Sequence, residues 1–266
     1  MGRAHNDFFS FGKGLPAMLY TVQGIVLRTT DYGEGNKILR LLTREAGKVG
    51  VMARGAKKVK SRFGAATQPF TCGEYVYFKS SGLGTLSSAE ITYAHNGLHE
   101  DLMKSAYASY VAEMADRMLE DGEGSAALYD QLAAALAAIE DDKDAQIVVH
   151  IFEMQMLKMA GYAPILEECV SCGSRTGPFA FSAQLGGTLC PLCLHKDAQG
   201  IALPEGALKL LRLFTGVDIR RLGATTVKSE TKAVLKQCMR AYMDAHIGIA
   251  WKARHFLDQM EKYPLS

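Results

Sequence analysis

The sequence has no long apolar run, and this absence excludes integral membrane proteins. None of the hydrophobic stretches in the 266 residues approaches the roughly 18–20 residues that a membrane-spanning helix needs. The first 17 residues include Phe8, Phe9 and Phe11, but Gly, Asn, Asp and Lys interrupt them, so they lack the apolar core of a secretory signal. Internal repeats and low-complexity linkers are absent as well. We therefore expect a cytoplasmic chain without a membrane partner.

Motifs that mark several enzyme classes are also missing. The segment DYGEGN at residues 31–36 lacks the G-x-G-x-x-G spacing and the following Lys-Ser/Thr of a nucleotide loop, so a turn between two strands is predicted there. A zinc deaminase would need an H-x-E segment, and none of the seven histidines supplies one. No Ser/His/Asp or Cys/His arrangement stands out, although a catalytic set dispersed along the chain stays an open alternative. No catalytic centre is predicted.

The formal net charge is only +2, but the charges are unevenly distributed along the chain. Residues 1–90 hold 13 Lys/Arg against 6 Asp/Glu, residues 91–165 hold 4 against 13, and residues 166–266 hold 13 against 9. The chain thus has a basic head of +7, an acidic middle of −9 and a mildly basic tail of +4. Such asymmetry indicates an anionic partner for the head, whereas the acidic middle is better suited to spacing or protein contacts.

Hydrophobic patterning divides the chain into a β part and a helical part. Short runs of β-branched and aliphatic residues predict strands at residues 20–30, 37–43, 48–53, 70–80 and 83–92. This many short strands in so little sequence favours a small closed barrel, of which the OB-fold is the five-stranded form. From about residue 98 the spacing becomes helical, with Ser125 as a predicted cap and Pro204 as a predicted first helical residue.

Four of the six cysteines form two close pairs with seventeen residues between them: Cys169 and Cys172, then Cys190 and Cys193. Each pair places two sulfurs at one tight turn, and two such turns can enclose a tetrahedral Zn²⁺. Four thiolates leave no ligand position for water, so a structural zinc is predicted rather than a catalytic one. Four reduced cysteines without a metal are the alternative. Cys72 and Cys238 are expected to be buried apolar thiols.

These patterns together predict an α+β protein. Residues 1–18 are expected to be a disordered extension, because regular patterning begins only at Tyr20. An N-terminal five-stranded OB-fold barrel is expected at 19–95. An all-helical domain at 96–266 follows it, with a four-cysteine zinc module inserted at 166–196.

Nine basic residues of the predicted barrel are candidates for phosphate contacts: Arg28, Lys37, Arg40, Arg44, Arg54, Lys57, Lys58, Lys60 and Arg62. The densest run lies at 54–62, where small residues between the cations suit a loop that contacts phosphates. Tyr75, Tyr77 and Phe78 could stack on unpaired bases, but aromatic residues of strands more often belong to a core. An ordinary solvated loop is the alternative for the cations. Net positive charge on a barrel type that commonly binds oligonucleotides favours nucleic-acid binding.

Several stretches resemble the RecO family of bacterial DNA repair proteins. The resemblance is carried by GIVLRTTDYGEGNK at 24–37, LTREAGKVGVMARGAKK at 42–58, SGLG at 81–84, YASYVAE at 107–113, LLRLF at 210–214 and FLDQM at 256–260. It spans about residues 19–262 and includes the order of barrel, helices, cysteine pairs and helices. The sequence is similar to the branch of the family that keeps all four cysteines.

The resemblance implies a mediator of DNA repair and homologous recombination without a catalytic centre. Such proteins bind single- and double-stranded DNA, anneal complementary strands and help to load recombinase on gapped DNA in the RecF pathway. The implied partners are RecR and the C-terminal tail of the single-stranded-DNA-binding protein, and association with the nucleoid is implied as well. By motif position, the family's DNA contacts match Lys37, Arg40, Arg44, Arg54 and Lys57. Two alternatives stay open: an OB-fold RNA- or ribosome-associated factor with a structural zinc, and a zinc-dependent nuclease.

Overall fold

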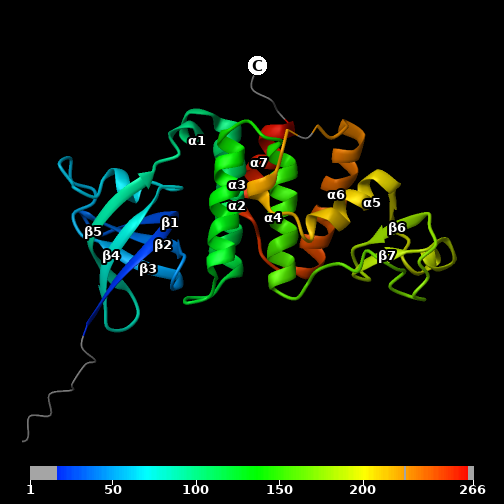
Figure 1. The fold of residues 1–266 in the computed structure, drawn as a ribbon, viewed down its shortest axis with the longest axis horizontal. Helices are drawn as coiled ribbons and strands as arrows, with labels where there is room; N and C mark the ends of the chain where they lie inside the picture. Colours follow the sequence, from blue (N-terminus) through cyan, green and yellow to red (C-terminus); the bar gives the residue numbers. More distant parts are fainter. Residues whose placement is uncertain (1–16, 225, 263–266) are drawn as a thin grey trace, which may run out of the picture.

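The computed structural model describes residues 17–224 and 226–262, and in it the chain forms an elongated molecule (Figure 1). A barrel at one end is followed by a central group of helices, and a small sheet lies at the opposite end. Residues 1–16, most of the predicted extension, lie outside the described part, whereas Met18 is already the first residue of a strand. No helix within the described ranges combines the length and apolar character needed to cross a bilayer.

The barrel consists of β1 (Met18–Tyr32), β2 (Asn36–Thr43), β3 (Gly47–Ala53), β4 (Cys72–Lys79) and β5 (Gly84–Tyr93), with a 3-10 turn, η1 (Ala65–Thr67), before β4. It closes in the order β1-β2-β3-β5-β4, and β1 pairs with both β2 and β4. The register of β1 against β2 shifts between Val26 and Arg28. This bulge bends the long strand, so that it can pair with both β2 and β4. The predicted five-stranded barrel is confirmed, and its strand order is that of an OB-fold.

Aromatic side chains of β4 fill the barrel interior. Tyr75 and Tyr77 are 0% and 1% exposed, and the ring of Tyr77 stacks on Tyr20 at 5.2 Å between centroids. Both tyrosines are therefore core residues and not stacking platforms for bases. Phe78, which follows on the same strand, is 47% exposed and presents its ring to solvent.

The helical part consists of α1 (Asn96–Glu100), α2 (Leu102–Met118), α3 (Ala126–Glu140), α4 (Ala145–Met159), α5 (Glu205–Phe214), α6 (Ser229–His246) and α7 (Lys252–Lys262), with the 3-10 turns η2 (Pro191–Lys196) and η3 (Ile219–Arg221). The predicted cap of α3 is confirmed, because the Ser125 hydroxyl accepts a hydrogen bond from the backbone N–H of Leu128. The prediction for α5 is wrong by one residue, because Pro204 is its N-cap and the helix begins at Glu205.

A small antiparallel sheet follows α4 and carries the cysteine region. It consists of β6 (Phe179–Ser182), β7 (Gly187–Leu189) and β8 (Ile201–Leu203), with β6 in the middle. Strands β6 and β7 form a hairpin between the two cysteine pairs. Strand β8 is not predictable from its sequence, because three residues are too few to show alternation.

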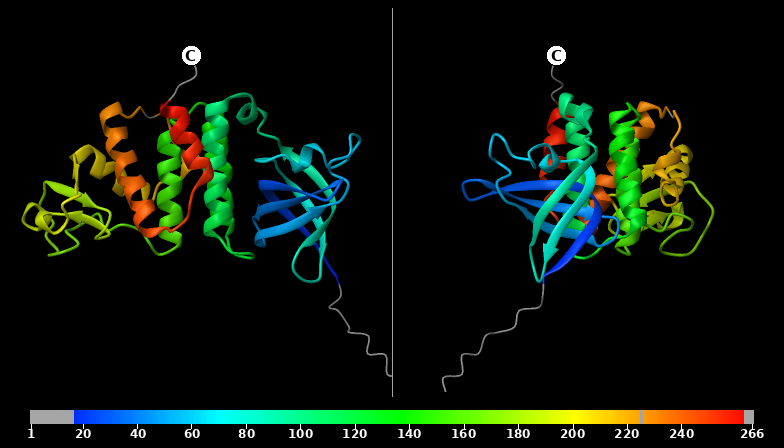
Figure 2. Two further views of the ribbon diagram at one scale, coloured as in Figure 1. Left: turned by 180° about the vertical axis from the view of Figure 1, so that it is seen from behind. Right: turned by 60° about the vertical axis from the view of Figure 1, so that its left-hand side comes forward.

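The barrel and the helices are joined directly after α2, which lies beside the barrel in both views of Figure 2. Lys48 of β3 donates its backbone N–H to the carbonyl of Glu123 (2.7 Å) and accepts the N–H of Gly122 (2.8 Å). Helix α2 has already ended at Met118, so the segment that follows it is free to pair with β3. The hydrophobic core is also shared, since Ile25 of β1 belongs to the same buried cluster as the inner faces of α2 and α4.

Gly47 lies where this junction leaves no room for a side chain. Its φ is +65°, and a Cβ would lie 2.4 Å from the carbonyl oxygen of Glu123. Gly33 is a matched control, because its φ is +59° but nothing lies within 4 Å of its Cβ position. We expect Gly33→Ala to lower the free energy of unfolding by about 1–2 kcal/mol, the cost of left-handed backbone. Gly47→Ala should lower it by about 2 kcal/mol more, because backbone must move. Denaturant unfolding measures both, and equal losses would contradict the close approach.

A buried ionic network joins α2, α4, α6 and α7. The carboxylate of Glu153 is fully buried and accepts a hydrogen bond from the Tyr110 hydroxyl at 2.7 Å. His150 Nδ1 and the guanidinium of Arg240 lie 2.7 Å and 3.2 Å from the same carboxylate. Burial alone would raise the pKa of Glu153, but the charges and hydrogen bonds of its neighbours outweigh burial and lower it. Arg240 also bonds Asp258 (3.1 Å), which holds α7 on α6.

The lowered pKa of Glu153 predicts sensitivity to acid. A carboxyl group whose pKa is lower in the folded chain contributes stability above its unfolded pKa, and this contribution is lost as the pH falls through the folded pKa. The ordinary pKa is 4.5, so the free energy of unfolding should fall below about pH 5. Glu153→Gln should be less stable at neutral pH and should show a flatter dependence on pH in this range. Denaturant titrations at several pH values test this, and identical slopes for both proteins would refute it.

Candidate nucleic-acid interface and metal site

The nine candidate phosphate contacts fall into two groups. Three of them face the helices, and each pairs with an aspartate of the acidic middle: Arg28 with Asp116 (2.5 Å), Arg40 with Asp121, and Arg44 with Asp130 (2.9 Å). Part of the basic head thus neutralises the acidic middle within the molecule. The charge pattern of the sequence alone does not distinguish such pairs from a surface for an external anion.

Lys48 is buried at the centre of this junction. Its ammonium group donates to the carbonyl oxygens of Asp116 (2.5 Å) and Leu119 and lies 3.8 Å from the Asp116 carboxylate. Burial is the main cause of its lowered pKa, and the nearby aspartate opposes this effect. The last carbonyls of a helix have no partner within the helix, and Lys48 supplies one for the end of α2. Sequence reasoning missed Asp116 as its partner, because Asp116 lies on the same polar helix face as Ser105, Ser109 and Glu113 and carries no sign of burial in the sequence.

The second group surrounds one loop, residues 54–62, which we call the basic loop. Figure 1 shows it in light blue, projecting from the barrel on the side away from the helices. Its exposed cations are Arg54, Lys57, Lys58, Lys60 and Arg62. Lys37 lies beside them, because β2 pairs it with Ala53 at the start of the loop. Six of the nine candidates therefore gather around one exposed segment.

Most cations of the basic loop have no acidic partner. Among the described residues, no carboxylate forms an ion pair with Lys37, Arg54, Lys58 or Lys60. Lys57 lies 2.7 Å from Asp31 and lowers the pKa of that carboxyl group through their hydrogen bond. Arg62 donates a hydrogen bond to the backbone carbonyl oxygen of Ser87 (2.9 Å), and its guanidinium group lies over the ring of Phe63. The charge of this group is therefore largely available to an external anion.

The basic loop is held in shape at both ends. Ala56 and Phe63 are each 5% exposed and pack in the barrel core. The side-chain oxygen of Asn36 accepts a hydrogen bond from the N–H of Gly55 at 2.9 Å. Val59 is fully exposed between the lysines. A framework that fixes the backbone lowers the conformational entropy lost when the cations bind phosphates.

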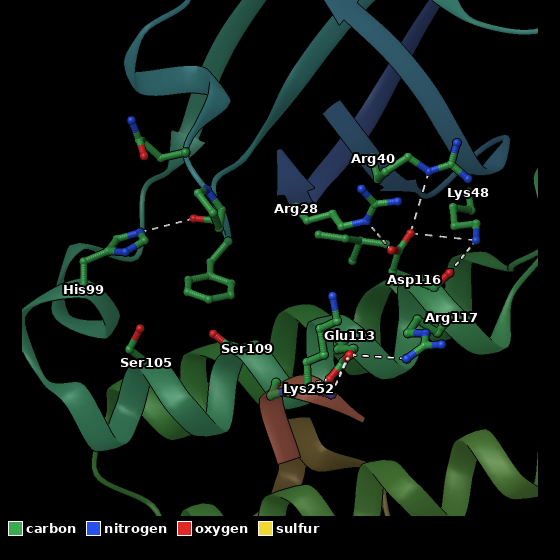
Figure 3. Close-up of a pocket in the computed structure, with 15 residues that line it drawn as sticks. Arg28, Arg40, Lys48, His99, Ser105, Ser109, Glu113, Asp116, Arg117 and Lys252 are labelled. Carbon is green, nitrogen blue, oxygen red and sulfur yellow. Dashed lines mark hydrogen bonds and ion pairs between the residues drawn. The ribbon is translucent and has the colours of Figure 1, made fainter. Parts of the chain in front are cut away.

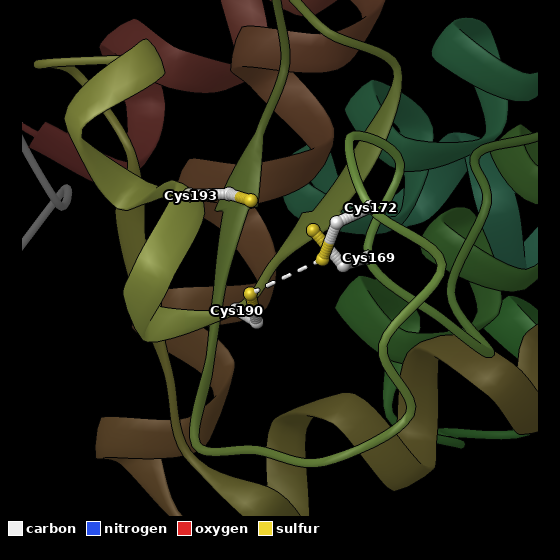
Figure 4. A group of neighbouring side chains, drawn as sticks. All are labelled: Cys169, Cys172, Cys190 and Cys193. Carbon is white, nitrogen blue, oxygen red and sulfur yellow. Dashed lines mark hydrogen bonds between the residues drawn. The ribbon is translucent and has the colours of Figure 1, made fainter.

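The four paired cysteines meet at one point of the module (Figure 4). Their sulfurs all lie within 4.8 Å of one another, and the Cys172 and Cys190 sulfurs are 3.6 Å apart. Tetrahedral zinc with bonds of about 2.3 Å would separate its sulfur ligands by roughly 3.8 Å. Cys172 is exposed, whereas the other three are buried. The cluster has the spacing and the donor set that a Zn²⁺ ion requires.

The ionisation of these thiols also fits a cation. Burial opposes ionisation of Cys169, but backbone hydrogen bonds from residues 190, 171 and 172 outweigh it and lower the pKa of Cys169 to about 6. A backbone hydrogen bond favours the thiolate of Cys172, but the three neighbouring sulfurs dominate and raise its pKa to about 12. One thiolate therefore forms readily here, and a second one is disfavoured. A divalent cation removes this repulsion, which is why metal binding at such sites releases protons.

The two remaining cysteines are apolar core residues, as predicted. Cys72 is 7% exposed in β4 and Cys238 is 0% exposed in α6. Burial raises the pKa of each thiol to about 12, so neither is a thiolate at neutral pH.

Comparison with known proteins covers nearly the whole chain. The family model "Recombination protein O N terminal" matches residues 18–95, and "Recombination protein O C terminal" matches residues 99–255. The DNA repair protein RecO of Bacillus subtilis (strain 168) is 45% identical over 244 residues, which are 92% of this chain and 96% of that protein. The DNA repair protein RecO of Listeria monocytogenes serotype 4b is 43% identical over 241 residues, which are 91% and 94% of the two chains. The corresponding protein of Halalkalibacterium halodurans is 41% identical over 244 residues, or 92% and 96%.

Proposed function

The chain belongs to the RecO family of DNA repair proteins, and on that premise we propose that it is a recombination mediator that binds single- and double-stranded DNA and anneals complementary strands. The observation that carries the proposal is the basic loop, with its unpaired cations on a rigid frame. We assign the phosphate contacts to Lys37, Arg54, Lys57, Lys58, Lys60 and Arg62. Arg28, Arg40 and Arg44 are engaged by aspartates, so their contribution to this surface is smaller.

Annealing on such a surface follows from electrostatics. Two complementary strands repel each other through their phosphates, and a cationic surface lowers this repulsion while it releases counterions. Contacts to phosphate carry no sequence information and leave the bases free to pair. Phe78 is exposed on the same barrel and offers one ring for a base. No bond is made or broken, so the activity needs no catalytic group.

The same proposal assigns different roles to the barrel and to the helical domain. Residues 19–95 act as the DNA-binding domain, and the helical domain at 96–266 provides surfaces for protein partners. The partners expected from the family are RecR and the C-terminal tail of the single-stranded-DNA-binding protein. With them the protein would load recombinase on gapped DNA in the RecF pathway, at the nucleoid in the cytoplasm.

We propose that the module at 166–196 holds one structural Zn²⁺ on Cys169, Cys172, Cys190 and Cys193. Four thiolates complete a tetrahedral site, so the ion would stabilise the module and would leave no position for a substrate. This donor set also argues against a zinc-dependent nuclease, which needs an open ligand position. Among the described residues, these cysteines are the one group of metal-ligating side chains close enough to hold an ion.

The test is annealing of complementary oligonucleotides that are coated with the single-stranded-DNA-binding protein. We expect faster duplex formation in the presence of the protein, with EDTA in the buffer and intact strands at the end. Strands that are cleaved only when free metal is present would favour the nuclease. An RNA competitor of the same sequence addresses the remaining alternative, because an RNA-reading factor would prefer it through contacts to the 2′-hydroxyl groups.

A further inference from the structure

A cleft of about 950 Å³ lies between the barrel and helices α2 and α7 (Figure 3). Five of the residues that line it are Arg or Lys, and two are Asp or Glu. Arg28 enters it from β1, whereas Arg117 and Lys252 enter it from the two helices. The cleft is thus a cationic hollow to which both parts of the molecule contribute. It is separate from the basic loop, which projects from the far side of the barrel.

The two carboxylates of the cleft are already engaged within the protein. Glu113 accepts the backbone N–H groups of Lys252 (3.0 Å) and Ala253 (2.7 Å) at the start of α7. The carboxylate of Asp116 forms ion pairs with three cations, Arg28, Arg40 and Lys48. The ammonium group of Lys252, by contrast, has no carboxylate partner among the described residues. Arg28 and Arg117 form ion pairs with Asp116 (2.5 Å) and Glu113 (3.7 Å), but their side chains stay 53% and 38% exposed. The charge left over in the cleft is positive and reachable.

The other end of the cleft offers apolar and aromatic surface at a strained point of the backbone. His99 is exposed there, and its ring stacks on Phe70 at 5.3 Å between centroids. Phe70 has a φ of +69°, which is unusual for a bulky residue, and its N–H is held by the carbonyl of Val26 at 2.7 Å. Strained backbone persists where the surroundings impose it, and it is concentrated at binding and catalytic sites.

The size of the cleft selects between forms of nucleic acid. Its volume of about 950 Å³ is at the upper end of the range for sites that hold a small ligand, about 300–1,000 Å³. A double helix does not fit, because its major groove alone is about 12 Å wide. Phosphate groups suit the cationic end, and a base suits the histidine end. A short single-stranded segment provides both.

We infer that this cleft is a second nucleic-acid site, which takes a short single-stranded segment with its phosphates on Arg28, Arg117 and Lys252 and a base against His99. The inference rests on the proposed function and extends it to the helical domain, which the family resemblance does not supply with DNA contacts. Two separate sites let one molecule hold two single-stranded segments, and annealing requires two strands.

The test uses the full chain, a labelled oligothymidylate and a duplex of equal length. The variant Arg117→Ala, Lys252→Ala removes two cations from the cleft and leaves the basic loop intact. On single strands each phosphate contact contributes a factor of about 5 at 0.1 M salt, so affinity should fall about 25-fold and the salt slope should become shallower by about 1.4. Binding of the duplex should not change. The single variant Lys252→Arg keeps the positive charge and leaves Arg117 in place. It should therefore bind oligothymidylate with the affinity of the natural protein.

A second readout comes from the single tryptophan of the chain. Trp251 directly precedes Lys252, is 4% exposed, and its ring lies 6.0 Å from that of Tyr110 in α2. Oligothymidylate should change its fluorescence in the natural protein and in a Lys58→Ala, Lys60→Ala variant, but not in the cleft variant. The control Arg175→Ala, Lys209→Ala removes two exposed cations from the far end of the molecule and should alter neither readout.

Three outcomes would overturn the inference. Equal weakening of single strands and duplex in the cleft variant would indicate a general loss of charge. An unchanged salt slope would show that no phosphate lies in the cleft. A free mononucleotide that reproduces the fluorescence change and displaces the oligonucleotide would identify the ligand as a nucleotide and not a strand. In each case the proposed function is still supported if the Lys58→Ala, Lys60→Ala variant binds DNA more weakly than the natural protein. The proposed function itself is contradicted if the natural protein does not bind DNA.

Discussion

The Cys190→Ser variant is expected to lose the bound metal and to unfold locally around the small sheet. Cys190 is 2% exposed, and the serine oxygen would be a poor ligand for zinc and a buried polar group. Loss of a structural metal belongs to the few single changes that destabilise by more than about 4 kcal/mol. Phe181 of β6 packs against Tyr242 of α6 (5.6 Å), so the loosening should reach α6. The barrel should be spared, because its inner core forms a cluster of its own.

Metal analysis and hydrogen exchange measure this result. One zinc ion per chain is expected in the natural protein and none in Cys190→Ser, with loss of amide protection in β6 and β7 but not in β1–β5. Cys238→Ala is the matched control, because it removes a buried thiol outside the cluster and should keep the zinc. Natural protein that is free of zinc, or a Cys190→Ser variant with unchanged protection, would contradict the structural metal.

Removal of three cations from the basic loop is expected to weaken DNA binding about 100-fold. The variant Arg54→Ala, Lys58→Ala, Lys60→Ala loses three predicted phosphate contacts, each worth a factor of about 5 on single strands at 0.1 M salt. The slope of log affinity against log salt should become shallower by about 2, and the loss should be similar on any base sequence. The three side chains are exposed and form no ion pair with any residue of 17–224 or 226–262, so folding and zinc content should not change.

The control for this experiment removes the same charge elsewhere. Arg175→Ala, Lys196→Ala, Lys209→Ala takes three exposed cations from the opposite end of the chain and should leave affinity nearly unchanged. If both triple variants weaken binding equally, net charge and not the loop attracts DNA. If neither does, the site must be sought elsewhere, for example at Arg221 and Lys228. Arg40 is a poor choice for such tests, because it bonds Asp121 and its removal would disturb the junction.

The local elements and the metal cluster are predictable because short-range information defines them. The strands of the barrel follow alternating patterns, and the cap at Ser125 follows from one hydroxyl before an apolar helix. The spacing of Cys169, Cys172, Cys190 and Cys193 predicts a cluster without knowledge of the fold, because two tight turns already bring each pair together. The fold class and the family therefore follow from the sequence by itself.

The division of the basic residues is decided only by the tertiary structure. Arg40 and Lys58 are equivalent in the sequence, since both are cations of the predicted barrel. In the folded chain Arg40 meets Asp121, more than eighty residues further on, whereas Lys58 meets no carboxylate among the described residues. The same holds for the cleft, whose cations come from β1, α2 and α7. Charge composition counts groups along the chain, but the field that a ligand meets depends on which charges the fold has already paired, because Coulomb interactions fall with distance in space and not in sequence.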